Sequence, residues 1–522
     1  MRRVGVVGAG TMGSGIAHVC AVCGCDVVLY DTTEEFLRRG LYRIARQMDD
    51  AVSRNRLSAS ARDAARARIV PTLDLNAFAG CDLVIEAAPE DLAIKQEIFR
   101  TLDALADDAI LASNTSSLSI TELAAVTRRP GRVAGLHFFN PAHILPLVEV
   151  VRGEATSDET VAALVAFCRR IEKTPVVAAD TPGFIVNRVA RPFYGEALRI
   201  VGEGLADVAT VDSAVRDGGG FRMGPFELMD LIGIDVNFAV TRSVYEAFFG
   251  EPRYRPHPIQ RRMVASGRLG RKTGRGFYEY GNAQRTPPPL LEPQQAPAGP
   301  YAVCGGEMAD ELTEHLRGRG HAVLRPLRGQ PPRGVAAVFV VEPDRGSMRE
   351  WIGAVDDGDP GVPVLAGCLT ASRAEVASWS QLPQRVHGFV ALPPLRDRGV
   401  VEWIGCGEPP ATLWALGLPA LRVGDAPGGI LARILAMLVN EAAFAYAEGV
   451  ASAAEIDTAM RLGTNYPRGP FRWAEDIGVG LVAGILAALH GYYGEERYRT
   501  APLLRRAALA GRWPSEIGGG EG

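Results

Sequence analysis

Short apolar runs alternate with longer amphipathic stretches over the first 180 residues. Residues 4–7, 27–30 and 145–151 are almost entirely apolar, as in strands that are buried within a domain. Residues 1–31 have the pattern of a strand, a tight turn, a helix and a second strand. Because strands that alternate with helices form sheets covered by helices, the pattern predicts an α/β, Rossmann-type domain over residues 1–180.

The pattern changes at residue 181. Apolar residues then recur at helical spacing between turns of small residues, and Pro182 suits the start of a helix. These features predict an all-α domain over residues 181–282, which we expect to close over a ligand in the first domain. Residues 283–300 are too rich in proline for a helix or an inner strand, and they predict a linker.

Beyond the linker the chain repeats itself. Residues 427–478 align without gaps on residues 182–233, with an offset of 245 residues. Such self-similarity predicts a second all-α domain over residues 425–516. Residues 386–403 resemble the end of the first domain, which predicts a degenerate Rossmann-like domain over residues 301–424.

Composition narrows the class of protein. The chain has 522 residues, of which 47% are hydrophobic and 22% charged, as in globular proteins of several domains. The formal net charge of -4 gives no reason to expect nucleic acid or an anionic membrane as a partner. No uncharged apolar run reaches the length of a membrane span, and glycines interrupt the apolar N-terminus where a signal peptide would be continuous. We therefore expect a cytoplasmic protein.

Three of the eight cysteines are close together. Cys20, Cys23 and Cys25 form C-x2-C-x-C, a spacing that can bind a metal ion. A structural metal site usually needs a second group of ligands, and none follows nearby in the sequence. We expect no metal.

The first candidate ligand site is a glycine turn. Gly8, Gly10 and Gly13 form G-x-G-x-x-G between a strand and a helix, the arrangement that lets a dinucleotide pyrophosphate approach the backbone. Asp31 ends the second strand, 23 residues after Gly8. An acid at this position accepts hydrogen bonds from ribose hydroxyls and repels a 2′-phosphate, which favours NAD over NADP. Alternatively, Asp31 only caps the next segment.

Polar residues follow the later strands. Glu90 ends one, a turn at residues 114–117 follows another, and His137 and Asn140 lie at the end of a third. Because ligands bind beyond the carboxyl ends of strands in open α/β sheets, these side chains should line one crevice.

His137 has a possible partner. Glu149 interrupts the next apolar strand, and a buried carboxylate is costly unless it is paired. A carboxylate bonded to one imidazole nitrogen raises the basicity of the other, which would make His137 a general base. Alternatively, His137 is a core histidine bonded to a backbone carbonyl.

Seven ordered motifs carry a resemblance. Residues 1–282 resemble the L-3-hydroxyacyl-CoA dehydrogenases. The motifs are GAGTMG, SNTSSL, HFFNP, LVEVV, TPGFIVNR, MGPFELMDLIG and GRKTGRGFYEY. The resemblance implies NAD as cofactor, an acyl-CoA thioester as substrate, and oxidation of the 3-hydroxyl group. It also implies a helical hairpin near residues 35–70 that meets CoA.

The resemblance implies roles for individual residues. His137 is the base, Glu149 its partner, and Ser116 and Asn187 orient the substrate. Cofactor contacts are implied for Gly8, Gly10, Thr11, Met12, Gly13, Asp31, Glu90, Lys95, Asn114, Ser116, Asn140 and Lys272. The helical domain forms the dimer interface in this family, and we expect the second copy to pair with the first within one chain. A homodimer of such chains is also expected.

The second copy lacks this chemistry. The replacements are Val390 for His137, Leu369 for Ser116, Pro393 for Asn140, Ala432 for Asn187 and Arg325 for Asp31. Glu402 keeps the position of Glu149, and without a histidine we expect it to be exposed or paired with an arginine. Our hypothesis is a decayed copy whose core pattern survives and whose chemistry does not.

The substrate stays open. Two-copy chains of this kind resemble dehydrogenases that act on 3-hydroxyadipyl-CoA in phenylacetate breakdown, and others of similar build act on 3-hydroxybutyryl-CoA. A dicarboxylic substrate needs a cation at its distal end. Arg188, Arg191 and Arg222 are candidates, but each could equally form a surface ion pair.

Two other classes are alternatives. One is a β-hydroxyacid dehydrogenase, which acts on free acids with a lysine base, but no segment resembles its active-site motif. The other is a crystallin-like protein without activity on the same fold, against which the full set of candidate catalytic residues argues.

Overall fold

The computed structural model describes residues 1–281, 290–405 and 407–513. These residues form two compact units. Unit one comprises Met1–Arg188 and Ala445–Asn465, and unit two comprises Val189–Phe444 and Tyr466–Gly522. Each unit contains one eight-stranded sheet. A segment of the second helical domain therefore belongs to the same unit as the first sheet.

The sheet of unit one has the order β3-β2-β1-β4-β5-β6-β7-β8. Neighbouring strands are parallel except β6 and β7, which are antiparallel. The strand order reverses between β1 and β4, and this is where doubly wound sheets bind their ligands. The strands are β1 (Arg3–Val7), β2 (Asp26–Tyr30), β3 (Ile69–Thr72), β4 (Leu83–Glu86), β5 (Ile110–Ser113), β6 (Val133–Phe138), β7 (Leu147–Arg152) and β8 (Thr174–Ala179).

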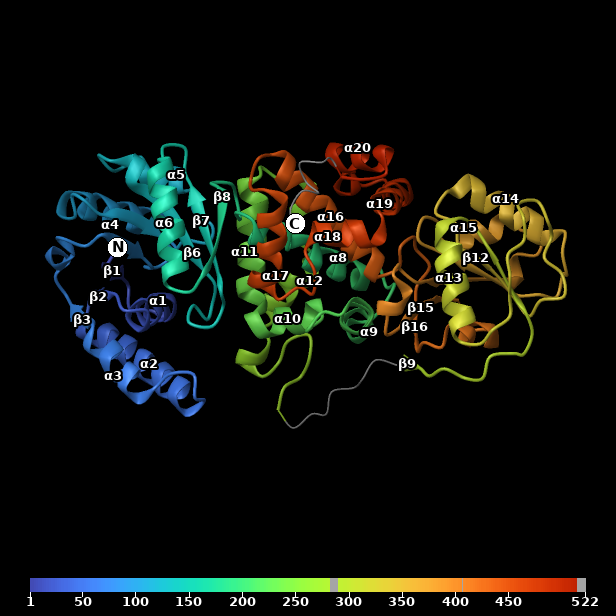
Figure 1. The fold of residues 1–522 in the computed structure, drawn as a ribbon, viewed down its shortest axis with the longest axis horizontal. Helices are drawn as coiled ribbons and strands as arrows, with labels where there is room; N and C mark the ends of the chain where they lie inside the picture. The colour runs from blue at the N-terminus through green and yellow to red at the C-terminus, as the bar shows by residue number, and fades with distance from the viewer. Residues whose placement is uncertain (282–289, 406, 514–522) are drawn as a thin grey trace. The chain divides into compact units, whose positions relative to one another are not determined.

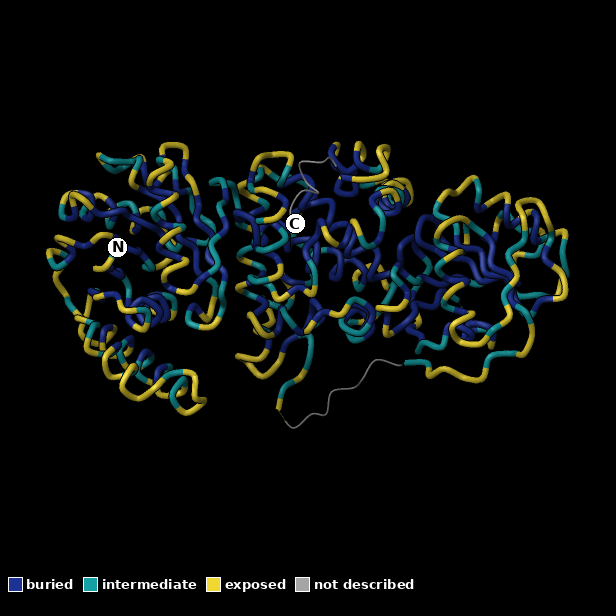
Figure 2. The backbone as a smooth tube through the Cα atoms, viewed as in Figure 1, coloured by how far each residue is buried: buried dark blue, intermediate teal, exposed yellow. Residues whose placement is uncertain are grey.

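Helices pack against this sheet and bury its inner strands (Figure 1). Every residue of β4, β5 and β6 is buried, which explains their continuous apolar sequences. Figure 2 shows the inner strands in dark blue, whereas the hairpin of α2 and α3 has long exposed stretches. The helices are α1 (Thr11–Val22), α2 (Glu34–Ser53), α3 (Ala59–Ala67), α4 (Leu92–Leu105), α5 (Ile120–Ala124) and α6 (Asp158–Arg170). The predicted Rossmann-type fold is confirmed.

The sheet of unit two repeats this topology. Its order is β11-β10-β12-β13-β14-β15-β16-β9, and β14 and β15 are antiparallel, like β6 and β7. In sheet order, strands β11 to β16 match β2 to β8, and no strand among the described residues takes the place of β3. The extra strand β9 lies in the predicted linker and pairs with β16 at the sheet edge, where proline-rich sequence is tolerated. Residues 283–289 of that linker lie outside the described residues. The strands are β9 (Leu290–Leu291), β10 (Tyr301–Cys304), β11 (Val323–Leu324), β12 (Ala337–Val340), β13 (Val364–Gly367), β14 (Val386–Val390), β15 (Val401–Ile404) and β16 (Ala420–Val423).

The remaining segments are helical, as predicted. Helices α13 (Glu307–Gly318), α14 (Arg345–Asp356) and α15 (Arg373–Ser378) accompany the second sheet. Those that follow the two sheets are α7 (Val186–Val189), α8 (Arg191–Gly202), α9 (Val208–Ser213), α10 (Pro225–Ile232), α11 (Ile234–Ala247), α12 (Pro258–Ala265), α16 (Leu431–Ala447), α17 (Ala453–Thr464), α18 (Pro470–Ile477), α19 (Val479–Tyr493) and α20 (Pro502–Ala510). Within the described ranges no single helix is long and apolar enough to cross a membrane. Only α18 and α19 taken together reach that length and composition, and they meet at 98°.

The two copies exchange equivalent contacts. In unit one, Ala179 at the end of β8 donates its N–H to the carbonyl oxygen of Val450 at 2.8 Å. In unit two, Gly424 beyond β16 donates its N–H to the carbonyl oxygen of Leu205 at 2.6 Å. The residues correspond at the offset of the sequence repeat. Each of these contacts joins a residue of one copy to a residue of the other, so the copies pair within the chain.

Candidate active site at the carboxyl ends of the first sheet

The glycine turn is built for close approach. Gly8 has φ +97°, and a Cβ on Gly13 would lie 1.8 Å from the carbonyl oxygen of Gly8, so neither position accepts a side chain. A Cβ on Gly10 would meet no atom within 4 Å, which leaves the backbone open to a ligand. Thr11 and Met12 begin α1, whose first turn contains no acidic residue. The turn therefore presents unobstructed helix N–H groups, as phosphate binding requires.

Asp31 lies directly beside this turn. Its Oδ2 accepts the N–H of Ala9 at 2.7 Å, and its Oδ1 accepts the N–H of Thr32 at 2.7 Å. The cap of α2 is Thr33, whose side chain accepts the N–H of Phe36. Asp31 therefore does not cap that helix, and the alternative reading of this residue is wrong.

Glu90 organises the turn after β5. Its Oε1 accepts the hydroxyl of Thr115 at 2.6 Å, the N–H of Ser116 at 2.9 Å and the hydroxyl of Ser117 at 2.9 Å. Burial by itself raises the pKa of Glu90, but the charge of Lys95 and these hydrogen bonds outweigh it and lower the pKa. Glu90 is therefore held as a carboxylate beneath the turn.

Lys95 lies under the same turn. Its side chain is 1% exposed, and its Nζ is 2.6 Å from Glu86 Oε1 and 3.4 Å from Glu90 Oε2. Glu86 also accepts the hydroxyl of Ser113 at 2.6 Å. Sequence reasoning missed Glu86, although a glutamate at the end of an apolar strand was visible in the motif CDLVIE. The ammonium group of Lys95 faces these two carboxylates. The direct contact with the cofactor that the resemblance implies for Lys95 stays a prediction.

Two asparagines follow the neighbouring strands. Asn114 Oδ1 accepts the N–H of Phe138 at 2.9 Å, which ties the end of β5 to the end of β6. Asn140 is exposed just beyond β6. Both asparagines lie just beyond the carboxyl ends of their strands, where the sequence predicts the ligand crevice.

His137 and Glu149 form a buried pair. They are directly opposite each other on the antiparallel strands β6 and β7. Nδ1 of His137 is 2.7 Å from Oε2 of Glu149, and the two side chains are 8% and 0% exposed. Because a carboxylate only accepts, Nδ1 carries the hydrogen, and in the neutral imidazole Nε2 then keeps its lone pair. No partner for Nε2 occurs among the residues that the structure describes. The predicted pairing is confirmed.

The second oxygen of Glu149 anchors the start of α7. Glu149 Oε1 accepts the N–H groups of Ile185 at 3.0 Å and Val186 at 2.9 Å. The ring centroids of Phe139 and Phe184 lie 4.5 Å and 5.9 Å from that of His137. These contacts, which sequence reasoning missed, fix both the carboxylate and the imidazole plane. The motifs HFFNP and TPGFIVNR contain both phenylalanines.

Ser116 and Asn187 both lie in unit one with this pair. Ser116 belongs to the turn held by Glu90, and Asn187 is on α7. The side-chain amide of Asn187 is 3.5 Å from the carbonyl oxygen of Ser116. The four candidate catalytic residues are therefore carried by β6, β7, the turn after β5 and α7 of one compact unit.

The predicted cations lie in different surroundings. Lys272 belongs to unit two, where its Nζ is 2.7 Å from Asp235 Oδ2. Arg188 is completely buried in unit one, with Nη2 2.7 Å from Glu448 Oε2. Arg191 is buried in unit two, and Arg222 is exposed there. The surface ion pair considered for Arg188 and Arg191 is therefore excluded by their burial.

Glu402 differs from its prediction. It is neither exposed nor paired with an arginine, because its carboxylate is buried and accepts the N–H groups of Ile430 at 2.6 Å and Leu431 at 2.9 Å. Burial raises the pKa of Glu402 to about 7, although the two N–H groups lower it. The glutamate is retained because it anchors a helix start, a task that needs no histidine.

The second glycine turn is obstructed. Arg325 donates to the carbonyl oxygens of Val303 and Gly305, both at 3.0 Å, and contacts Asp310 at 2.8 Å. Helix α13 has two acidic residues in its first turn, Glu307 and Asp310. Acidic groups at a helix N-terminus oppose phosphate, so these features fit the hypothesis of a decayed copy.

Comparisons with known proteins agree on one family. The model of the 3-hydroxyacyl-CoA dehydrogenase NAD binding domain matches residues 3–181, and that of the 3-hydroxyacyl-CoA dehydrogenase C-terminal domain matches residues 183–280 and 428–520. The chain is 39% identical over 515 residues to 3-hydroxyadipyl-CoA dehydrogenase of Escherichia coli (strain K12), with 98% of each chain covered.

Shorter relatives match about half of this chain. 3-hydroxybutyryl-CoA dehydrogenase of Bradyrhizobium diazoefficiens is 43% identical over 288 residues, which are 55% of this chain and 98% of the relative. A crystal structure of 3-hydroxybutyryl-CoA dehydrogenase from Escherichia coli K12 matches both copies, with a TM-score of 0.81, 37% identity and 98% of each chain covered.

Proposed function

Because the chain belongs to the 3-hydroxyacyl-CoA dehydrogenase family, we propose that His137 removes the proton from the 3-hydroxyl group of its acyl-CoA substrate. The protein is an NAD-dependent enzyme that oxidises an L-3-hydroxyacyl-CoA to the 3-oxoacyl-CoA. The observation that carries the role of His137 is its 2.7 Å contact with the buried Glu149.

The first glycine turn fits NAD. Gly8, Gly10 and Gly13 leave the backbone open, and the N–H groups of Thr11 and Met12 would meet the pyrophosphate. Asp31 would accept the ribose hydroxyls and disfavour NADP. When bound, NAD would supply the hydride acceptor for oxidation at C3 of the substrate.

The chain supplies the proton acceptor. With Nδ1–H bonded to Glu149, Nε2 of His137 accepts the hydroxyl proton, and the carboxylate stabilises the imidazolium that forms. Glu149 keeps its position because two backbone N–H groups also hold it. Ser116 and Asn187 orient the hydroxyl and thioester groups.

The other candidate contacts have supporting roles in this proposal. Glu90 holds the turn that carries Ser116, and Lys95 supports Glu90 from below. Asn114 and Asn140, at the ends of β5 and β6, contact the cofactor. Lys272 pairs with Asp235 in unit two, and its contact with the cofactor stays a prediction.

We propose 3-hydroxyadipyl-CoA as the substrate. The relative of that name matches 98% of this chain, whereas the relative from Bradyrhizobium named 3-hydroxybutyryl-CoA dehydrogenase matches 55% of it. 3-Hydroxybutyryl-CoA remains the second candidate, since the full-length solved structure carries that name.

One assay tests the proposal. NADH formation is measured with 3-hydroxyadipyl-CoA, 3-hydroxybutyryl-CoA and the free 3-hydroxy acid. We expect kcat/KM to be highest for the dicarboxylic thioester and negligible for the free acid. A higher kcat/KM for 3-hydroxybutyryl-CoA would make that thioester the substrate in place of 3-hydroxyadipyl-CoA. Equal turnover of the free 3-hydroxy acid would show that the enzyme does not require an acyl-CoA thioester.

A further inference from the structure

We propose that the second copy completes the active site of the first, and that Glu448 is the positioning residue through which it does so. The proposal rests on the proposed role of Asn187 in binding substrate. Glu448 belongs to the segment Ala445–Asn465, which is part of the same compact unit as His137, Glu149 and Asn187. Its carboxylate would hold Arg188, and thereby Asn187, in place.

The helix that carries Asn187 depends on anchors. Helix α7 is a single turn of four residues, and a turn of this length is not stable by itself. Its start is fixed by Glu149, which accepts two N–H groups there. Arg188, the residue after Asn187, is completely buried, and its Nη2 is 2.7 Å from Glu448 Oε2. Asn187 therefore lies between two anchored positions. Glu149 of the first copy holds the backbone before it, and Glu448 of the second copy holds the side chain after it.

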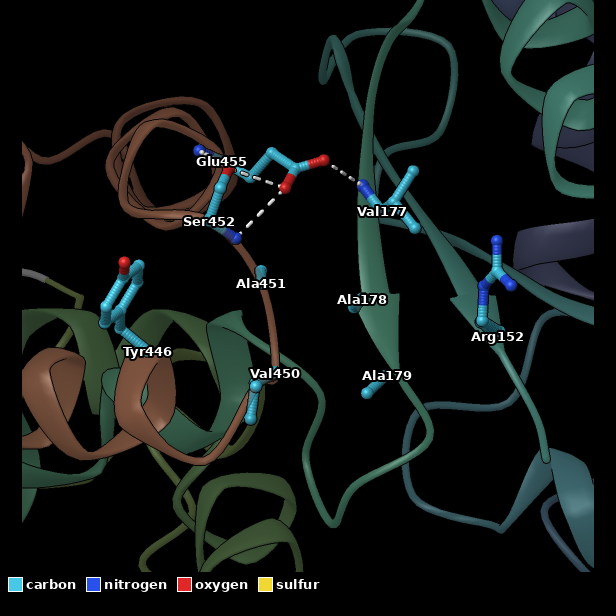
Figure 3. Close-up of a pocket in the computed structure, with 10 residues that line it drawn as sticks. Arg152, Val177, Ala178, Ala179, Tyr446, Val450, Ala451, Ser452 and Glu455 are labelled. Atoms are coloured by element: carbon cyan, nitrogen blue, oxygen red, sulfur yellow. Dashed lines mark hydrogen bonds between the residues drawn. The ribbon is translucent and has the colours of Figure 1, made fainter. Parts of the chain in front are cut away.

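The loop that carries Glu448 is itself fixed to the first sheet. Val450 accepts the N–H of Ala179 at 2.8 Å, and Glu455 Oε1 accepts the N–H of Val177 at 2.9 Å. Figure 3 shows these strand and loop residues on the two sides of a pocket of about 460 Å³, with Glu455 reaching across to Val177. Ser452 and Glu455 also form a capping box at the start of α17. The segment that follows Glu448 is thus hydrogen-bonded to strand β8.

Strand β8, which binds this segment, also pairs with the strand that carries Glu149. Strand β8 is parallel to β7, and Val176 is the register partner of Glu149. Helix α17 also approaches the start of α7, since a Cβ on Gly463 would lie 2.8 Å from Leu147 Cδ2 and 3.0 Å from Val186 Cγ2. The second copy therefore contacts the strand of Glu149 and the helix of Asn187 together.

The chain contains its own control for this proposal. In unit two, Arg433 Nη1 is 2.8 Å from Glu203 Oε2, and these residues correspond to Arg188 and Glu448. Ala432 stands there in place of Asn187. The equivalent ion pair consequently lies beside a position that has no substrate-binding side chain. Loss of the Glu203 pair should affect stability without affecting catalysis.

The central test compares E448Q with E203Q. Glutamine keeps the size of the side chain and removes its charge. Since a displacement of about 1 Å can cost roughly 10²-fold in rate, we expect E448Q to lower kcat by at least about ten-fold per folded enzyme. We expect E203Q to leave kcat unchanged, and KM for NAD to be unchanged in both. Equal kcat in E448Q, E203Q and the parent enzyme would overturn the proposal.

A double-mutant cycle separates positioning from general damage. If Glu448 acts through Asn187, E448Q should lower kcat much less in the N187A background than in the parent enzyme. Fully additive losses would overturn the role of Glu448. Unchanged kcat in N187A alone would instead refute the role of Asn187 in the proposed function, so the two failures are distinguishable.

A second pair of variants covers the case in which E448Q does not fold. G463A would press on Val186 and should lower kcat. G218A is the control, because a Cβ on Gly218 would lie 3.3 Å from Val400 and 3.4 Å from Leu431, the corresponding residues of the other copy. Equal kcat in G463A and G218A, with melting temperatures near that of the parent, would contradict the proposal.

Discussion

Glu149 and Glu402 perform the same structural task in the two copies. Glu149 accepts the N–H groups of Ile185 and Val186, and Glu402 accepts those of the corresponding residues Ile430 and Leu431. Each carboxylate joins the antiparallel strand of a sheet to the start of a helix. In the first copy alone, the other carboxylate oxygen also binds a histidine. The helix anchor thus persists without the base.

Replacing Glu402 should change stability and its pH dependence. Burial raises the pKa of Glu402 to about 7, so the folded protein holds a proton that the unfolded chain releases near the ordinary carboxyl value. The resulting stability is present below the unfolded pKa and is lost as the pH rises through about 7.

Urea unfolding at pH 5 and pH 8 measures this effect. The parent should lose more stability than E402Q between these pH values, and kcat of E402Q should match that of the parent. A parallel pH dependence of the two proteins would contradict the buried, proton-binding state of Glu402.

The two glycine turns should differ in NAD binding. G13A would place a Cβ 1.8 Å from the carbonyl oxygen of Gly8, so the turn must distort and NAD binding should be lost. G306A, in the turn of the second copy, is the control, because its Cβ would meet only Glu342 Oε2, at 3.7 Å. Calorimetry should give one NAD per chain for the parent and for G306A, and none for G13A. Two NAD sites per chain in the parent enzyme would refute the hypothesis that the second copy has lost its chemistry.

Much of the first copy could be predicted from sequence. The alternation of apolar runs with amphipathic stretches reflects strands buried on both faces, and the glycine spacing reflects the backbone approach seen at Gly13. His137 and Glu149 could be paired because a buried carboxylate needs a partner. These inferences depend on local pattern and on one adjacent strand.

The missed features depend on distant contacts. Glu402 was expected to be exposed or paired with an arginine because its bond to the N–H groups near residue 430 joins segments far apart in the sequence. The ion pair of Arg188 with Glu448 spans even more of the chain. The sequence repeat indicates that two copies exist, but not that they exchange these contacts.

The proton acceptor is the central claim, and kcat of H137Q tests it most directly. Glutamine can still donate to Glu149 but cannot take a proton, and general bases contribute about 10²–10⁴-fold. With saturating NAD and acyl-CoA, kcat should fall by about that factor while the Kd for NAD stays unchanged. A kcat equal to that of the parent enzyme would remove His137 from the mechanism.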